Sequence, residues 1–208
     1  MQWPVVINMN KVLIFIFILS STIGFSQDSL IPKIEWNGTS ENENQYVALL
    51  RLRDRNSLIV KVAYTGYWLK GISGKYIVFQ NDGKIKRYNV FQPTDSDSKT
   101  KIKRKRVRKK DFEYYRAHLR NCVYENKLSI IKSKLNITEK PGAKKGTMIT
   151  KVISDGANYH FGIYQGKNYI AYGSYEPESF IEDEFPGYQE RKKLVDLMSG
   201  FESLMEKY

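Results

Sequence analysis

Apolar residues come in short runs over most of the chain, separated by polar stretches rich in turn-forming residues. Between residues 45 and 91 these runs are rich in branched and aromatic side chains, which is typical of antiparallel strands. The turn Asn81-Asp82-Gly83 is the strongest hairpin indicator, because Asn and Gly tolerate the positive φ that tight turns need. In this half of the chain the pattern predicts strands at 46–50, 58–62, 67–69, 76–79 and 84–91.

A helix is predicted in the middle of the chain, after a polar stretch. Asp111 is positioned to cap it, and it would run to about Asn126. Its residues with helical spacing on one apolar face are Phe112, Tyr115, Leu119, Cys122 and Val123.

The rest of the chain predicts more strands and a second helix. Asp155-Gly156 and Gln165-Gly166-Lys167 mark turns between the later strands. The final segment, 189–207, has an apolar stripe with helical spacing, which an antiparallel sheet with one apolar face would cover. The strands predicted here are 128–135, 147–153, 159–164 and 169–172, and the stripe consists of Leu194, Leu197, Met198, Phe201, Leu204 and Met205.

These elements predict an α+β fold, with an antiparallel β-sheet of two meanders covered by a central helix and a C-terminal amphipathic helix. Residues 45–208 are expected to form a single domain, and two domains divided near 93–110 are the alternative. Residues 27–44 hold few side chains that can pack, so we expect a flexible lead-in there.

The N-terminal residues 1–26 have the parts of a secretory signal peptide. Lys11 precedes an apolar run, and Gly24 and Ser26 provide the small residues before a cleavage site. The run is too short to span a bilayer core, which takes about 20 apolar residues, so we expect no transmembrane anchor in the mature chain. An exported protein of a bacterial periplasm or exterior is predicted, translated from Met1 or Met9.

The most biased segment lies between residues 99 and 110, where nine of twelve residues are Lys or Arg. It supplies most of the surplus behind the net charge of +12. Blocks of like charge resist burial, so an exposed loop or edge strand is expected. The candidate residues for contact with an anionic partner are Lys99, Lys101, Lys103, Arg104, Lys105, Arg106, Arg108, Lys109 and Lys110.

Several partners fit this segment. An anionic polymer, a lipid headgroup or an acidic protein would gain from the clustered cations through release of counterions. An internal partner is also available, because five carboxylates stand just before the final helix. These are Glu176, Glu178, Glu182, Asp183 and Glu184, which lack the spacing of a known calcium loop.

The sequence contains no motif for nucleophilic catalysis, metal binding or nucleotide binding, and we expect no cofactor. His118 and Cys122 stand four residues apart, a spacing that any helix produces by accident, and Cys122 lies on the apolar stripe. His160 is interpreted as a packed strand residue. The tyrosines between 159 and 175 could form a sugar-binding face, but packing of a sheet is the preferred interpretation.

The functional hypothesis is therefore an exported, non-enzymatic binding or accessory protein that contacts an anionic partner through residues 99–110. A small secreted hydrolase with unidentified catalytic residues is the alternative. The sequence does not indicate an oligomeric state.

Overall fold

The computed structural model describes residues 31–39, 45–95 and 97–208. Residues 31–208 form one compact unit. The predicted signal peptide lies outside the described residues. In chain order the elements are β1 Gly38–Thr39, α2 Gln45–Leu49, β2 Leu58–Gly66, η1 Tyr67–Leu69, β3 Gly71–Phe79, β4 Ile85–Pro93, β5 Lys101–Lys105, η2 Lys109–Asp111, α3 Phe112–Tyr124, η3 Lys132–Lys134, β6 Glu139–Pro141, β7 Met148–Thr150, β8 Ala157–Gln165, β9 Asn168–Tyr175, α4 Pro177–Glu182 and α5 Tyr188–Lys207.

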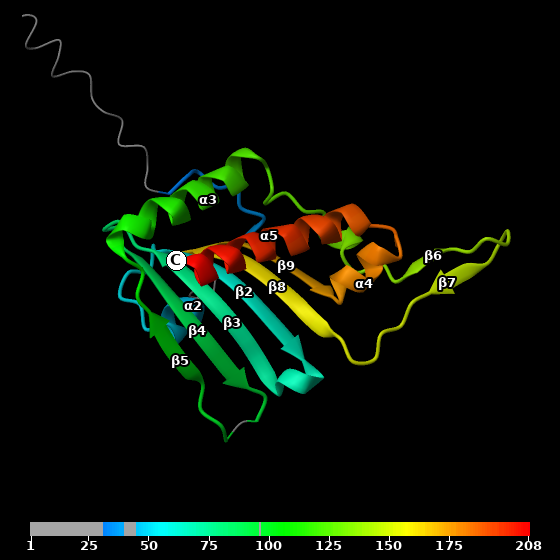
Figure 1. Cartoon of the computed structure of the whole chain (residues 1–208), viewed down its shortest axis with the longest axis horizontal. Coiled ribbons are helices and arrows are strands. Elements are labelled where there is room, and N and C mark those ends of the chain that lie inside the picture. Colours follow the sequence, from blue (N-terminus) through cyan, green and yellow to red (C-terminus); the bar gives the residue numbers. More distant parts are fainter. Residues whose placement is uncertain (1–30, 40–44, 96) are drawn as a thin grey trace, which may run out of the picture. The chain divides into compact units, whose positions relative to one another are not determined.

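A seven-stranded antiparallel sheet organises the fold, with strand order β1-β9-β8-β2-β3-β4-β5 (Figure 1). Strands β2 to β5 form one meander, and the β8–β9 hairpin joins the other side of β2. The hairpin turns predicted at Gly83 and Gly166 are confirmed, and both glycines have positive φ, 77° and 55°. The predicted α+β fold is thus confirmed.

Helices α3 and α5 cover one face of the sheet (Figure 1). The predicted apolar faces of both helices supply the core, including Tyr115, Leu119, Leu194 and Phe201, which pack on β2, β3, β8 and β9. On the opposite face the short helix α2 packs Tyr46 and Val47 against the sheet, in a second and smaller cluster. The described part of the predicted lead-in also contributes to the main core, through Ile34.

The prediction of a strand at 46–50 is wrong. These residues form α2 because Tyr46, Val47 and Leu50 have helical rather than alternating spacing, and all three are buried against Ile59 and its neighbours in the sheet. Arg51, with φ of 52°, ends the helix.

The prediction of a strand at 67–69 is also wrong. Strands β2 and β3 pair as far as Gly66 and Gly71, so the four residues between them must reverse the chain. They do so through the 3₁₀ turn η1, which leaves the side chain of Trp68 73% exposed.

The segment 128–135 is not a strand either, although Leu128, Ile130 and Leu135 are buried. Its backbone bonds to side chains rather than to another strand. The Ile131 N–H donates to Glu190, 3.0 Å away, and the Leu135 carbonyl accepts from other elements.

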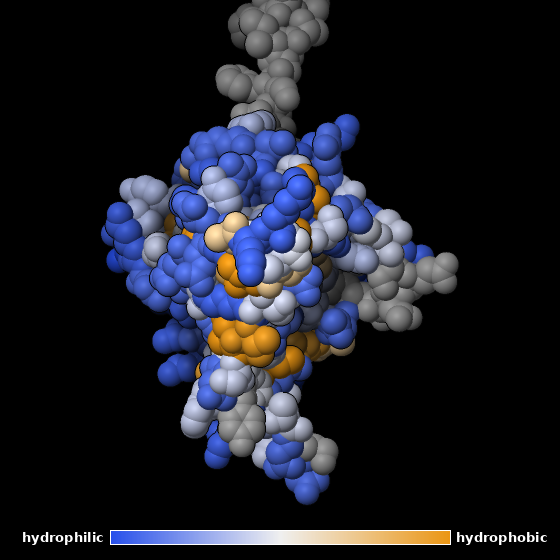
Figure 2. Space-filling view, turned by 90° about the vertical axis from the view of Figure 1, so that its right-hand side faces the viewer, coloured by the Kyte–Doolittle hydropathy of each residue, from blue (hydrophilic) through white to orange (hydrophobic). Residues whose placement is uncertain are grey.

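Of the predicted strand 147–153, only Met148–Thr150 forms a strand. This strand, β7, pairs with β6 in a separate two-stranded sheet and does not join the main one. The β6–β7 hairpin projects from the body of the fold (Figure 1). On the side of the molecule that carries this hairpin, apolar areas interrupt a mostly hydrophilic surface (Figure 2), and the hairpin segment itself exposes Met148, Ile149 and Val152.

Candidate functional site

The basic segment 99–110 lies at one edge of the main sheet. Its strand β5 pairs on one side with β4, from Arg87 opposite Lys105 to Phe91 opposite Lys101, and is the last strand in the sheet order. The segment is exposed except for the half-buried Lys105 and the buried Val107. Lys101, Lys103, Arg104 and Lys105 belong to β5, Lys109 and Lys110 begin η2, and Lys99, Arg106 and Arg108 lie outside these elements.

Strand alternation divides the cations between the two faces of the sheet. Lys105 is paired with Arg87, whose guanidinium donates to the Met205 carbonyl of α5, so Lys105 lies on the face that carries α3 and α5. Lys101 and Lys103 share this face. Arg104 is paired with Tyr88 and therefore lies on the face that carries α2.

Most of these cations are not neutralised within the fold. Arg108 donates to Asp111 through Nε, over 2.6 Å. Within residues 31–39, 45–95 and 97–208, the other eight candidate cations form no ion pair with a carboxylate. Burial lowers the pKa of nearby Lys86, and the positive charge of Arg104 lowers it further. The edge therefore carries concentrated positive charge.

The expected capping role of Asp111 is not what the structure shows. Asp111 precedes α3 in the N-cap position, but its side chain makes no capping hydrogen bond. Its buried carboxylate pairs with Arg108 instead, and this pair holds the end of the basic segment against the helix.

Two hollows adjoin β5. The larger, about 570 Å³, lies between the η1 turn and the start of β5, and its lining includes Trp68, Lys70, Lys99 and Lys101. The smaller, about 290 Å³, lies over β3, β4 and β5 and includes Lys103. The two hollows share Phe91 and Lys101, so they form one continuous surface along the basic strand.

Trp68 is the residue of this site that the sequence analysis missed, because it was assigned to a strand. The glycines that flank it carried the relevant information. Only four residues separate Gly66 from Gly71, too few for a strand of their own, and glycines are typical of turns.

Comparison with protein-family models and with curated proteins finds no match to this chain.

Two of the five carboxylates considered as an internal partner for the basic segment have other partners in the fold. Asp183 pairs with Lys151 over 2.5 Å, and this contact lowers the pKa of the Asp183 carboxyl. The Glu176 carboxylate accepts from the N–H of Ala157. Among the described residues no ion pair joins 99–110 to 176–184.

His118 and Cys122 both belong to α3, and their side chains face the core. They do not form a nucleophilic pair. Burial raises the pKa of the Cys122 thiol to about 11, which keeps the thiol protonated at neutral pH. Burial lowers the pKa of His118, whose ring packs edge-on against Phe201 at 4.6 Å between centroids. His160 lies in β8 as predicted, with Nε2 3.1 Å from the Thr65 hydroxyl.

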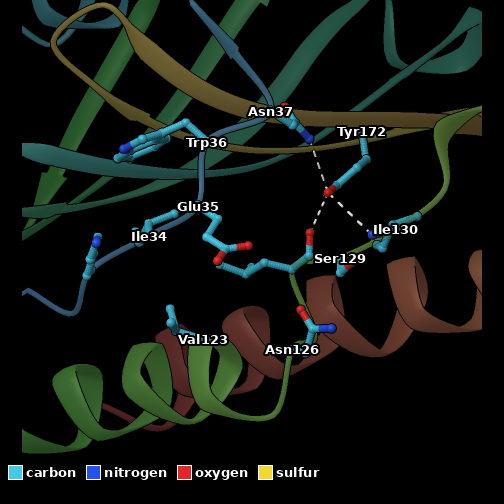
Figure 3. A pocket seen from close by; sticks show the side chains of 11 residues that line it. Ile34, Glu35, Trp36, Asn37, Val123, Asn126, Ser129, Ile130 and Tyr172 are labelled. Atoms are coloured by element: carbon cyan, nitrogen blue, oxygen red, sulfur yellow. Dashed lines mark hydrogen bonds between the residues drawn. The ribbon is translucent and has the colours of Figure 1, made fainter.

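A third hollow, of about 590 Å³, separates the 33–37 segment from the loop after α3 (Figure 3). Its central polar group is the Tyr172 hydroxyl. This hydroxyl accepts from Asn37 and from the Ile130 N–H and donates to the Leu128 carbonyl. Since these internal bonds occupy the hydroxyl, we interpret this hollow as part of the packing that holds the 33–37 segment against the rest of the fold.

The tyrosines of β8 and β9 serve the fold in a similar way. Tyr164 packs on Tyr46 and Tyr169, Tyr159 packs on Tyr64, and Tyr172 is buried. Their rings therefore do not form an open aromatic face. Of the helices in the described part of the chain, none has the length and apolar character to cross a bilayer.

Proposed function

We propose that this chain is a non-enzymatic binding module of an exported protein, and that β5 with its adjoining hollows contacts an anionic polymer. The observation that supports this most strongly is the set of eight cations, four of them in the exposed edge strand β5 and four beside it, that form no ion pair among the described residues. Clustered cations that lack internal partners gain free energy when a polyanion releases its own counterions on binding.

The arrangement of the cations favours an extended ligand. Alternate residues of a strand are about 6.8 Å apart, so Lys101, Lys103 and Lys105 form a row with this repeat on one face. A polymer with regularly spaced charges can follow such a row. A flat lipid surface fits less well, because Arg104 lies on the opposite face and both faces cannot meet one plane.

The test replaces the three lysines of this row by uncharged glutamine. The variant Lys101→Gln/Lys103→Gln/Lys105→Gln is expected to bind heparin at least about tenfold more weakly than the parent at 0.1 M salt. A plot of the logarithm of its binding constant against the logarithm of the salt concentration should have a slope that is shallower by up to about one unit per cation removed. Isothermal titration calorimetry at several salt concentrations measures both quantities.

A matched control removes the same charge elsewhere. Lys144, Lys145 and Lys167 are exposed and lie in loops away from β5, so their triple change to Gln lowers the net charge equally. This control should retain most of the affinity. Equal losses in both variants would mean that only net charge matters, and affinity independent of salt in the parent would overturn the proposal.

A further inference from the structure

We infer that the 570 Å³ hollow at the start of β5 seats one sugar ring, and that the anionic ligand is therefore an acidic polysaccharide. This inference rests on the proposed function, because it names the class of polymer that the same surface binds. The observation that carries it is the combination of one exposed indole with three lysines around a single hollow.

The position of Trp68 is set by the fold. The η1 turn holds the residue at the end of the β2–β3 hairpin, and Lys70, with φ of 47°, completes the reversal. Thr94, directly after β4, secures the turn, since both its N–H and its hydroxyl donate to the Lys70 carbonyl, over 3.1 and 3.0 Å. The indole is 73% exposed, although Trp side chains are on average highly buried in folded proteins.

The lining combines apolar and cationic groups in the way that a charged sugar requires. Phe91 and Pro93 contribute apolar surface together with the indole, and Lys70, Lys99 and Lys101 add ammonium groups. A sugar ring offers an apolar C–H face that can lie on an aromatic ring, while its carboxylates or sulfates point outward to cations. Inorganic polyphosphate has no apolar face and would make no apolar contact with the indole.

A single-stranded nucleic acid would need more rings. Proteins that bind such strands stack successive bases on successive aromatic side chains. On the face of β4 that lines the hollows, Phe91 is the aromatic side chain, and it is half-buried. Among the described side chains of this surface, the exposed ring of Trp68 is followed by a row of lysines, which fits a polymer with one seated ring and many charges.

The continuity of the surface gives the path of the polymer. The hollow at Trp68 shares Lys101 with the smaller hollow, and that hollow includes Lys103. A polysaccharide with one ring on Trp68 can therefore extend along β5, with its acidic groups meeting the lysine row.

The experiment compares three ligands of matched charge on the parent and on Trp68→Ala. These are a heparin oligosaccharide, inorganic polyphosphate and an oligothymidylate, each titrated at 0.1 M salt. We expect the variant to lose about tenfold in affinity for the oligosaccharide and less than about twofold for polyphosphate. The conservative variant Trp68→Phe, which keeps a ring, should recover part of the oligosaccharide affinity.

Tyr124→Ala provides the matched control, because Tyr124 is 76% exposed on α3 and does not line the hollow. It should leave all three affinities unchanged, and circular dichroism checks that each variant is folded.

Equal losses for oligosaccharide and polyphosphate on Trp68→Ala would overturn the sugar-ring inference while leaving anion binding intact. A larger loss for the oligothymidylate would replace the polysaccharide by a nucleic acid. Failure of the parent to bind any of the three would instead reject the proposed function itself.

Discussion

At the scale of single residues, one buried arginine holds together the part of the fold that the sequence pattern describes least well. Arg191 has no exposed surface, and its guanidinium donates to the carbonyls of Leu135, Pro186 and Ile137 at 2.9, 2.9 and 2.5 Å. The ring of Phe180 lies 4.8 Å from it. The arginine thus satisfies backbone carbonyls of two segments outside the strands, one before β6 and one between α4 and α5.

Replacing Arg191 by Met should therefore destabilise the protein strongly. Three carbonyls would lose a charged donor, and an unsatisfied buried polar group costs about 1–3 kcal/mol. We expect a loss of about 3 kcal/mol or more in the free energy of unfolding, measured by urea denaturation. Lys192→Met is the control, because its ion pair with Asp196 is exposed and contributes at most about 1 kcal/mol. A loss below about 1 kcal/mol for Arg191→Met would contradict this role.

At the scale of elements, the sequence predicts best what local periodicity determines. The two long helices and the β8–β9 hairpin are predicted within a few residues of their observed limits, whereas β3 begins at Gly71 and not at the predicted residue 76. The short runs at 46–50 and 67–69 are apolar for other reasons, one to cover the second sheet face and one to form a turn. Segment 128–135 has a strand-like share of branched apolar residues, but distant side chains such as Glu190 bond its backbone, and no local pattern shows this.

The candidate site also combines features that the local sequence determines with features that depend on distant contacts. The exposed basic strand could be predicted from composition, because nine cations within twelve residues cannot be buried together. The contribution of Trp68 could not, since the β2–β3 turn brings it beside Lys99 and Lys101, more than thirty positions along the chain.

The contact between α3 and α5 should make stability depend on pH. The His118 ring is buried against Phe201, its Nε2 has no hydrogen-bond partner in the described structure, and Gly200 leaves the space that the ring fills. Burial and the charge of Lys127 lower the His118 pKa from the ordinary value of 6.5, while Glu125 opposes this weakly. The unfolded chain therefore binds more protons, and the free energy of unfolding falls as the pH drops below about 6.5.

Urea denaturation between pH 5 and pH 8 measures this dependence. The variant His118→Phe removes the titrating group but keeps an aromatic ring, so its stability should decline less steeply below pH 6.5. The lowered pKa of His160 contributes to both proteins and cancels in the comparison. Parallel curves for parent and variant would show that His118 is not the responsible group.

At the scale of the whole molecule, helix α5 covers the middle strands of the sheet, and the candidate site lies at its β5 edge (Figure 1). Helix α5 ends over the middle strands, where Lys75 pairs with Glu202 and Glu206 at 2.9 and 3.1 Å. The lysines of β5 lie beyond this neutralised position. The core therefore stabilises one part of the sheet, and the charged, uncovered part is available for binding.

Ligands should accordingly differ in how much they stabilise the fold. Residues 99–110 are contiguous, so the unfolded chain retains much of its affinity for a ligand that only senses charge, and such a ligand stabilises little. A ligand that needs Trp68 beside Lys101 binds only the folded state. At 100 times its Kd such a ligand adds about 2.7 kcal/mol, which corresponds to an increase in Tm of roughly 5–10 °C.

Thermal denaturation with a saturating heparin oligosaccharide and with polyphosphate measures the difference. The oligosaccharide should raise Tm by several degrees more than the polyphosphate. Equal increases would show that the folded arrangement adds nothing to the contiguous charges.

Because β5 is the outermost strand of the sheet, its lysines also oppose association with other copies of the chain. An outermost strand offers unpaired N–H and C=O groups to the same strand of another copy, and a row of lysines repels such pairing. Glutamine in place of Lys101, Lys103 and Lys105 would remove this repulsion and leave an uncharged edge with Ile102 37% exposed. Preparations of that variant should therefore self-associate at concentrations where the parent stays dispersed, which light scattering would detect.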